Sequence, residues 1–359
     1  MTTIGPEAVL PLTQTYTPRT LRANLVPLDH NEGPAPSLDL LAMLRDVEPE
    51  LLRRYRTPAV LEAEIAASFG LEPDCVLVTA GGDEAIDRCC RSYLTVGRTI
   101  VLAQPTFEMF AHYARLARAE IRTALWPSGP FPLSAVLTEI ERARDTTRLI
   151  PVVSPNNPTG ETACSSDLHT LSQQAPRALI VVDHAYIEYG GEDLTRQALA
   201  LPNAVVLRTF SKARGLAGCR VGYTLGPPPV IAVLRATGAP YPVSSLSLAL
   251  AARQWRDGAE VLKQTVQRTC REREALQTLL AARGLVWRRS SANFVTFQLG
   301  RGAAPLAARM QTFGYSIKTL GGLLEGWVRL SLPCDETIFQ SLIQALAQSL
   351  DCCANGDAP

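Results

Sequence analysis

The feature that most constrains the fold is the alternation of short apolar runs with helical segments over the first two thirds of the chain. The apolar runs are rich in Val, Ile and Leu and cover 75–79, 99–103, 148–153, 178–182 and 204–207. Helical patterns separate them, near 83–95, 106–118, 133–144 and 166–174. Continuous apolar strands between helices are typical of a parallel sheet covered on both faces. The pattern therefore predicts an α/β fold with a mostly parallel central sheet.

The remaining segments predict a second, smaller unit. Two helices are expected upstream of the first strand, over 37–54 and 59–69, and a long helix over 245–283. Strands at 294–298 and 327–331 and a final amphipathic helix complete the chain. At 359 residues the chain exceeds one typical domain. We expect an N-terminal arm over 1–30 that joins the small domain, a large domain over 31–235, and a small α+β domain over 236–359.

The composition limits which classes of binding partner and which cellular compartment we expect for this protein. A formal net charge of +1 gives no electrostatic case for nucleic acid or an anionic membrane as partner. No apolar run approaches the roughly 18 residues of a membrane span, and the N-terminus lacks a secretory pattern. The nine cysteines form no C-x-x-C pair and the four histidines show no ligand spacing, so no metal is expected. These observations predict a cytoplasmic protein that binds small molecules.

Polar clusters follow the ends of the predicted strands, where open α/β sheets bind their ligands. The turn Gly81-Gly82-Asp83 opens a helix, and such a turn is either a plain connection or an anion site made of N–H groups. The stretch Ser154 to Gly160 holds Asn157 between two prolines, which fits either a structural turn or a rigid mount for one amide.

A third cluster ends the apolar run at 178–182. Asp183 there needs a partner, because a carboxylate at the end of a buried strand is costly when unpaired. A protonated heterocyclic nitrogen would satisfy it, and Tyr186 can reach the same ligand. The intervening His184 should point to the opposite face of the strand, and we interpret it as a packed, hydrogen-bonded histidine.

The fourth cluster, Thr209 to Arg220, contains Ser211 and Lys212. By itself it could be a surface loop with a solvated lysine. Together with the other three clusters it supplies a phosphate cradle, an amide, a carboxylate, a phenol and a lysine that can form a Schiff base. This set matches the requirements of pyridoxal 5'-phosphate (PLP). No G-x-G-x-x-G opens the first βα unit, which disfavours a nicotinamide enzyme.

In their order along the chain, these motifs resemble the fold-type I, class I/II PLP-dependent aminotransferases. The resemblance rests on Tyr55, Gly82-Asp83-Glu84, Pro105-Thr106-Phe107, Pro155 to Gly160, Asp183 to Tyr186, and Ser211-Lys212. It covers nearly the whole chain. Within this family, the sequence is most similar to histidinol-phosphate aminotransferases. The similarity is carried by the segments Arg208–Ala213, Gly215–Gly218, Tyr241–Ser244 and Ser291–Phe294.

The resemblance implies a role for each matching residue. Lys212 would hold the cofactor covalently and move the proton, Asp183 would pair with the ring nitrogen, and Asn157 and Tyr186 would contact the ring oxygen. Other cofactor contacts would come from Phe107 on the ring face and, at the phosphate, from Gly82, Asp83, Thr209, Ser211 and Arg220. Tyr55 would reach the phosphate of the partner subunit's cofactor, which implies a homodimer with shared active sites. Substrate contacts would come from Arg329, Tyr16, Tyr241 and Asn31.

The departures from the family concern mainly the substrate side. His184 stands where glutamate is usual, and the entry motif reads His30-Asn31-Glu32-Gly33-Pro34. Lys318 replaces a second arginine, and Arg329 to Pro333 differs from the usual Arg-Ile-Thr-Val-Gly. The resemblance implies transamination between L-histidinol phosphate and 2-oxoglutarate. The alternatives are an aminotransferase for another amino acid and a phospho-amino-acid decarboxylase on the same scaffold. A non-catalytic binding module is disfavoured because Lys212 and Asp183 are intact.

Overall fold

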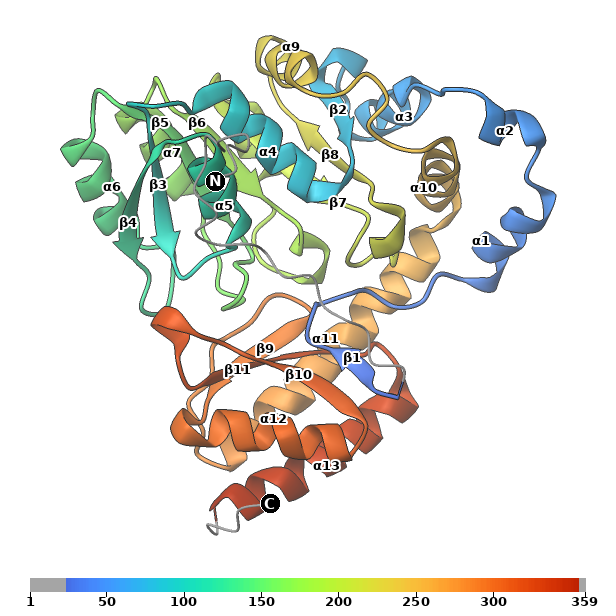
Figure 1. Cartoon of the computed structure of the whole chain (residues 1–359), viewed down its shortest axis with the longest axis vertical. Coiled ribbons are helices and arrows are strands. Elements are labelled where there is room, and N and C mark those ends of the chain that lie inside the picture. Colours follow the sequence, from blue (N-terminus) through green and yellow to red (C-terminus); the bar gives the residue numbers. More distant parts are fainter. Residues whose placement is uncertain (1–23, 355–359) are drawn as a thin grey trace, which may run out of the picture.

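The computed structural model describes residues 24–354 and contains a large and a small sheet (Figure 1). The large sheet has the strand order β2-β8-β7-β6-β5-β3-β4. Its strands are β2 (Val76–Thr79), β3 (Thr99–Gln104), β4 (Glu120–Leu125), β5 (Thr147–Val153), β6 (Leu179–Asp183), β7 (Ala204–Thr209) and β8 (Gly222–Leu225). β8 pairs antiparallel with both β2 and β7, and the other pairs of this sheet are parallel. The α/β fold with a mostly parallel central sheet is therefore confirmed.

Helices cover both faces of the large sheet because its strands are apolar on both sides. One face packs against α4 (Gly81–Tyr93), α5 (Met109–Leu116) and α9 (Pro228–Thr237). The other packs against α3 (Ala59–Phe69), α6 (Leu133–Arg142), α7 (Ser165–Gln174), α8 (Thr195–Leu199) and α10 (Ser245–Asp257). Neighbours on one strand alternate between the two cores, as Val181 and Val182 do.

The small sheet has the order β1-β10-β11-β9 and packs against three helices. Its strands are β1 (Val26–Leu28), β9 (Phe294–Gln298), β10 (Tyr315–Thr319) and β11 (Trp327–Ser331). The helices are α11 (Ala259–Ala282), α12 (Ala303–Thr312) and α13 (Glu336–Ala354). Parallel pairing of β1 with β10 joins the N-terminal part of the described chain to this sheet. In the described range, no helix combines the length and apolar character that a bilayer crossing needs.

Two predicted helices are wrong in their extent. The helix expected over 245–283 is interrupted at Gly258, which lies between α10 and α11, and only α11 continues toward the small sheet. The helix expected over 37–54 divides into α1 (Leu38–Ala42), a 3-10 turn and α2 (Pro49–Arg53), because Pro49 starts a new helix. The domain limit at residue 235 stays a prediction, and the packing of α10 on the large sheet favours a limit nearer Gly258.

The segment between β1 and α1 crosses from the small sheet to the loop that carries Lys212. At Gly33 the two backbones meet: a Cβ added there would lie 1.7 Å from the backbone oxygen of Lys212. We expect Gly33→Ala to push the segment away from Lys212, lowering turnover at least about tenfold and destabilising the fold by about 1–3 kcal/mol. Enzyme assays and urea unfolding measure both effects. Gly302→Ala is the control, because its added Cβ meets nothing nearer than 3.7 Å, and equal behaviour of the two variants would refute the prediction.

Candidate active site

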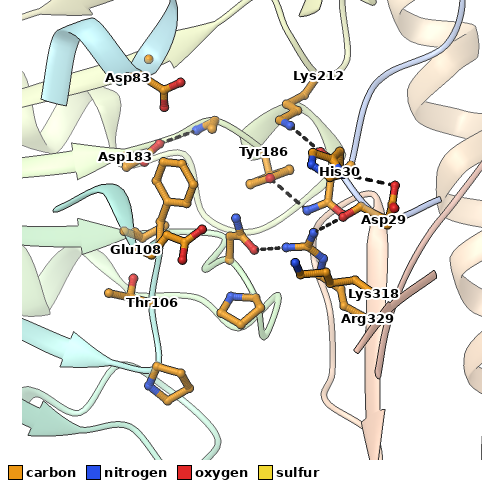
Figure 2. A pocket seen from close by; sticks show the side chains of 18 of the residues that line it. Asp29, His30, Asp83, Thr106, Glu108, Asp183, Tyr186, Lys212, Lys318 and Arg329 are labelled. Atoms are coloured by element: carbon orange, nitrogen blue, oxygen red, sulfur yellow. Dashed lines mark hydrogen bonds and ion pairs between the residues drawn. The ribbon is translucent and has the colours of Figure 1, made fainter. Parts of the chain in front are cut away.

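A cavity of about 900 Å³ lies where the carboxyl ends of the large sheet's strands face the small sheet (Figure 2). Residues at the ends of four parallel strands line it: Gln104 of β3, Val153 of β5, Asp183 of β6 and Thr209 of β7. The small sheet contributes Lys318 and Arg329, and the segment after β1 contributes residues 29–32. The topology therefore gathers the four predicted polar clusters around one space, as expected for a ligand site of an open α/β sheet.

One end of the cavity is suited to an anion. Gly82 and Asp83 lie in the first turn of α4, where backbone N–H groups have no acceptor one turn earlier. Arg220 donates to the Asp83 carboxylate, with Nη2 3.1 Å from Oδ2. The Thr209 hydroxyl donates to Ser211 Oγ at 2.9 Å and accepts from the Ser211 N–H. These donors together fit a phosphate group, which a helix N-terminus also attracts through its dipole.

Asp183 lies at the centre of the site. Its carboxyl is buried, and the Ala185 N–H donates to Oδ1 at 3.0 Å. Burial raises the pKa of Asp183 to about 6, against the opposing effect of that hydrogen bond, and the Asp83 charge adds to the rise. A protonated ring nitrogen would favour the ionised carboxylate here. The residues present therefore fit a pyridine-type cofactor whose phosphate occupies the anion site.

Lys212 and Tyr186 are held by the segment after β1. Lys212 Nζ donates to the backbone oxygen of His30 at 3.1 Å and lies 5.5 Å from the centre of the Tyr186 ring. Asn31 Nδ2 donates to the Tyr186 hydroxyl at 3.1 Å, and Ser331 Oγ donates to Asn31 Oδ1 at 2.7 Å. Asn31 lines the cavity but is only 1% exposed. Its amide thus fixes Tyr186, whereas the sequence predicted a substrate contact.

Two adjacent asparagines have different surroundings. Asn156 is buried and bonds to the Pro105 carbonyl and to Thr159, which holds the turn together. Asn157 lines the cavity, and its Oδ1 accepts from Arg329 Nη1 at 2.5 Å. Asn157 is therefore the residue placed for a ligand.

Arg329 lies on the small-sheet wall of the cavity. Its Nη2 donates to the backbone oxygen of Asp29 at 2.6 Å. Lys318 is its register partner on the antiparallel strand β10, and both residues line the cavity. The predicted ring-stacking residue Phe107 lines it as well. Figure 2 shows Lys318 and Arg329 side by side, opposite Asp183.

Two of the predicted aromatic contacts, Tyr55 and Tyr241, do not line this cavity. Tyr55 is 84% exposed and stacks on Tyr241, with 4.9 Å between ring centres and 21° between ring planes. The pair lies outside the cavity lining of its own chain. Tyr16 lies outside the described residues. Within one subunit the structure therefore leaves these roles as predictions.

The cavity is also lined by two acidic residues, Asp29 and Glu108, which the sequence analysis did not single out. Glu108 directly follows the motif Pro105-Thr106-Phe107, and this position next to a motif could have indicated that it lines the site. Asp29 reaches the cavity because β1 pairs with β10, and a strand of three residues carries too little pattern to reveal that pairing.

His184 is the packed histidine that the sequence suggested. It is fully buried, with Nδ1 2.5 Å from the Ser154 carbonyl, while Nε2 accepts from the Leu194 N–H at 3.0 Å. Since Nε2 accepts, Nδ1 carries the proton and the ring is neutral. Burial lowers the pKa of His184 to about 4. The side chain therefore ties the ends of β5 and β6 to the loop before α8.

This environment predicts an acid-sensitive contribution to stability. The folded pKa of His184 lies below its usual value of 6.5, so the unfolded chain binds more protons between about pH 6.5 and pH 4. Stability is lost as the pH falls through that window, by about 2 kcal/mol between pH 7 and pH 5 for this group. Urea unfolding at both pH values measures it. His184→Gln should lose about 2 kcal/mol less than the wild type over the same interval, and an identical loss would contradict the prediction.

Comparison with known proteins agrees with this geometry. The family model for aminotransferase class I and II matches residues 44–346. A curated histidinol-phosphate aminotransferase 2 from Pseudomonas fluorescens is 32% identical over 338 residues, covering 91% of this chain and 90% of the relative. The chain belongs to the class I and II aminotransferase family. It is a PLP-dependent transaminase, and the resemblance stated from its motifs is confirmed.

Two further relatives support the assignment of this aminotransferase. A histidinol-phosphate aminotransferase 2 from Methylococcus capsulatus is 33% identical over 289 residues, 77% of each chain. The crystal structure of histidinol-phosphate aminotransferase from Sinorhizobium meliloti in complex with pyridoxal-5'-phosphate superposes with a TM-score of 0.84 at 24% identity, covering 92% of each chain. The fold is therefore that of a fold-type I aminotransferase.

Proposed function

We propose that this aminotransferase moves the amino group of L-histidinol phosphate to 2-oxoglutarate, which yields imidazole acetol phosphate and L-glutamate. The observation that carries the proposal is the pair of cations Lys318 and Arg329 on the wall opposite Asp183. A phosphate or a carboxylate of the substrate suits these side chains. The curated relatives that bear the name histidinol-phosphate aminotransferase favour the phosphate.

The residues divide the chemistry as follows. Bound PLP supplies an electron sink for the bonds of the substrate α carbon. Lys212 Nζ would take the proton from that carbon and move it, which requires the amine to lie within reach of the carbon. Asp183 holds the proton on the ring nitrogen. Asn157 and the Tyr186 hydroxyl, which Asn31 orients, donate to the ring oxygen.

The phosphate of the cofactor belongs at the anion site. Gly82 and Asp83 present N–H groups there, and Thr209, Ser211 and Arg220 add side-chain donors. Phe107 packs on the ring face. Fixed donors of this kind orient the ring so that Lys212 meets the reacting carbon.

We also propose a cytoplasmic homodimer with shared active sites. Exposure of the stacked Tyr55 and Tyr241 rings supports it, because two large aromatic side chains seldom stay in water without a partner. In the dimer Tyr55 would reach the phosphate of the partner subunit's cofactor, and Tyr241 and Tyr16 stay predicted substrate contacts. Light scattering would detect the dimer, and a monomer with full activity would contradict it.

A different amine is the second candidate. Lys318 stands where the family has a second arginine. Its ammonium group lacks the planar, bidentate geometry with which a guanidinium binds a phosphate. Another amino acid with a single carboxylate would need only Arg329. A phospho-amino-acid decarboxylase would use the same Lys212 and Asp183 but release carbon dioxide.

Comparison of substrates tests the proposal. We expect kcat/KM with 2-oxoglutarate to be at least about a hundredfold higher for L-histidinol phosphate than for L-histidinol, since several charge-assisted hydrogen bonds are at stake. L-Histidine, L-aspartate and L-tyrosine are the competing donors. A higher kcat/KM for one of them would replace the proposed substrate, and release of carbon dioxide from a phospho-amino acid would identify a decarboxylase.

A further inference from the structure

His30 and Asp29 form a side-chain pair beside the two cations of the cavity wall. Figure 2 shows both residues next to Lys318 and Arg329. His30 Nδ1 lies 3.2 Å from Asp29 Oδ1, and Ser316 Oγ donates to Asp29 Oδ2 at 2.7 Å. Both members of the pair line the cavity, with side-chain exposures of 34% for His30 and 12% for Asp29. The pair is thus accessible to a ligand in the cavity.

The sheet explains this placement. Leu28, the last residue of β1, is in register with Ile317 of β10, so the chain leaves the sheet beside Lys318. Lys318 is in turn in register with Arg329 of β11. Arg329 is tied to the same segment, because its Nη2 donates to the Asp29 carbonyl. His30, Lys318 and Arg329 therefore come to one end of the small sheet.

The orientation of the ring leaves one nitrogen for a ligand. Asp29 accepts from Nδ1, so Nε2 is the ring nitrogen left for a ligand of the cavity that His30 lines. His30 and Ser316 each form a hydrogen bond with one carboxylate oxygen of Asp29. These hydrogen bonds reduce the repulsion that Asp29 exerts on an anion at this wall.

The position of Lys212 indicates which part of the substrate comes here. Lys212 Nζ donates to the His30 carbonyl at 3.1 Å, so His30 adjoins the reacting atoms. In L-histidinol phosphate the phosphate is joined to the α carbon through one CH₂–O unit, and the imidazole is on a separate branch. A group so near the α carbon has to lie close to Lys212, on the side of Arg329.

We propose that His30, held by Asp29, is a specificity residue that contacts the substrate phosphate through Nε2, alongside Arg329 and Lys318. This inference rests on the proposed function. It gives the wall a third polar contact where Lys318 lacks the planar guanidinium of an arginine. The phosphate would thus be held by the Arg329 guanidinium, the Lys318 ammonium and the His30 imidazole.

Substitution of His30 in the holoenzyme tests the proposal. We expect His30→Ala to raise KM for L-histidinol phosphate about tenfold or more, as a lost charge-assisted hydrogen bond and an uncovered Asp29 require, with kcat changed less than threefold. His30→Gln keeps a donor and should recover part of the loss. Turnover of L-histidinol, which lacks the phosphate, should fall less than threefold. His169→Ala, on α7 away from the cavity, is the control and should equal the wild type.

The outcomes separate the two proposals. An unchanged KM in His30→Ala, or equal losses for L-histidinol phosphate and L-histidinol, would overturn the role of His30. If the wild type does not use L-histidinol phosphate, the proposed function fails, and inhibition of the L-glutamate half-reaction by inorganic phosphate then tests His30. Weaker inhibition of His30→Ala than of the wild type would still support an anion contact, and equal inhibition would reject it.

Discussion

Lys212→Ala is expected to lower kcat by about 10⁴-fold or more and to remove the visible absorption band of the lysine-bound cofactor. The reason is that in the proposed function one amine both holds the cofactor and moves the proton. Lys212 Nζ lies in the cavity between the His30 carbonyl and the Tyr186 ring. Steady-state turnover with an amino donor and 2-oxoglutarate, together with an absorption spectrum, measures both losses.

The two other lysines of the chain make this result specific. Lys263, on the exposed side of α11, is the control, and Lys263→Ala should keep turnover and spectrum unchanged. Lys318 lines the cavity but belongs to the substrate wall, so it cannot replace Lys212 at the strand end. Normal turnover in Lys212→Ala would show that the core of the site is assigned wrongly.

Asp183→Asn is expected to lower kcat by about 10³-fold while part of the cofactor stays bound. Burial already raises the pKa of the Asp183 carboxyl to about 6, and in the proposed function a protonated nitrogen of the cofactor ring would stabilise its ionised form. An amide has the same shape but no charge to hold that proton. Loss of rate with retained cofactor, measured by assay and spectrum, is therefore the expected signature.

A matched variant controls for the general effect of removing a carboxylate. Asp87 lies on α4, the helix that supplies the anion site, and pairs with Arg91 away from the cavity. Asp87→Asn should keep nearly full turnover. A wild-type rate in Asp183→Asn would remove Asp183 from its role, and complete loss of the cofactor would show that it acts mainly in binding.

Apolar runs predicted the fold well where strands are buried on both faces. β5, β6 and β7 were located to within one or two residues of their limits because each contains a run of buried apolar residues. β4 was missed because it is an edge strand with mostly polar or exposed residues, and β8 because its residues Gly222–Leu225 contain no run of Val, Ile and Leu. Local pattern cannot report a pairing made by residues distant in the sequence.

The candidate site was predictable where a motif and a strand end coincide. Asp183, Asn157 and Lys212 were chosen on that ground, and the structure brings them to one cavity. Asn31 was assigned to the substrate, yet its amide is used by Tyr186 and Ser331, residues more than 150 positions away. Contacts of this kind form because the two sheets pack against each other, and a short sequence motif cannot predict that packing.

The half-reaction with L-histidinol phosphate tests the central claim most directly. The purified, PLP-loaded protein is titrated with this amine in the absence of any 2-oxo acid, and the visible band of the cofactor is followed. We predict rapid, saturable loss of the band as the cofactor takes up the amino group, reversed by 2-oxoglutarate. A band that does not respond to L-histidinol phosphate but falls with another amino donor would contradict the proposed substrate, and a protein that never acquires the band would contradict the account of the site.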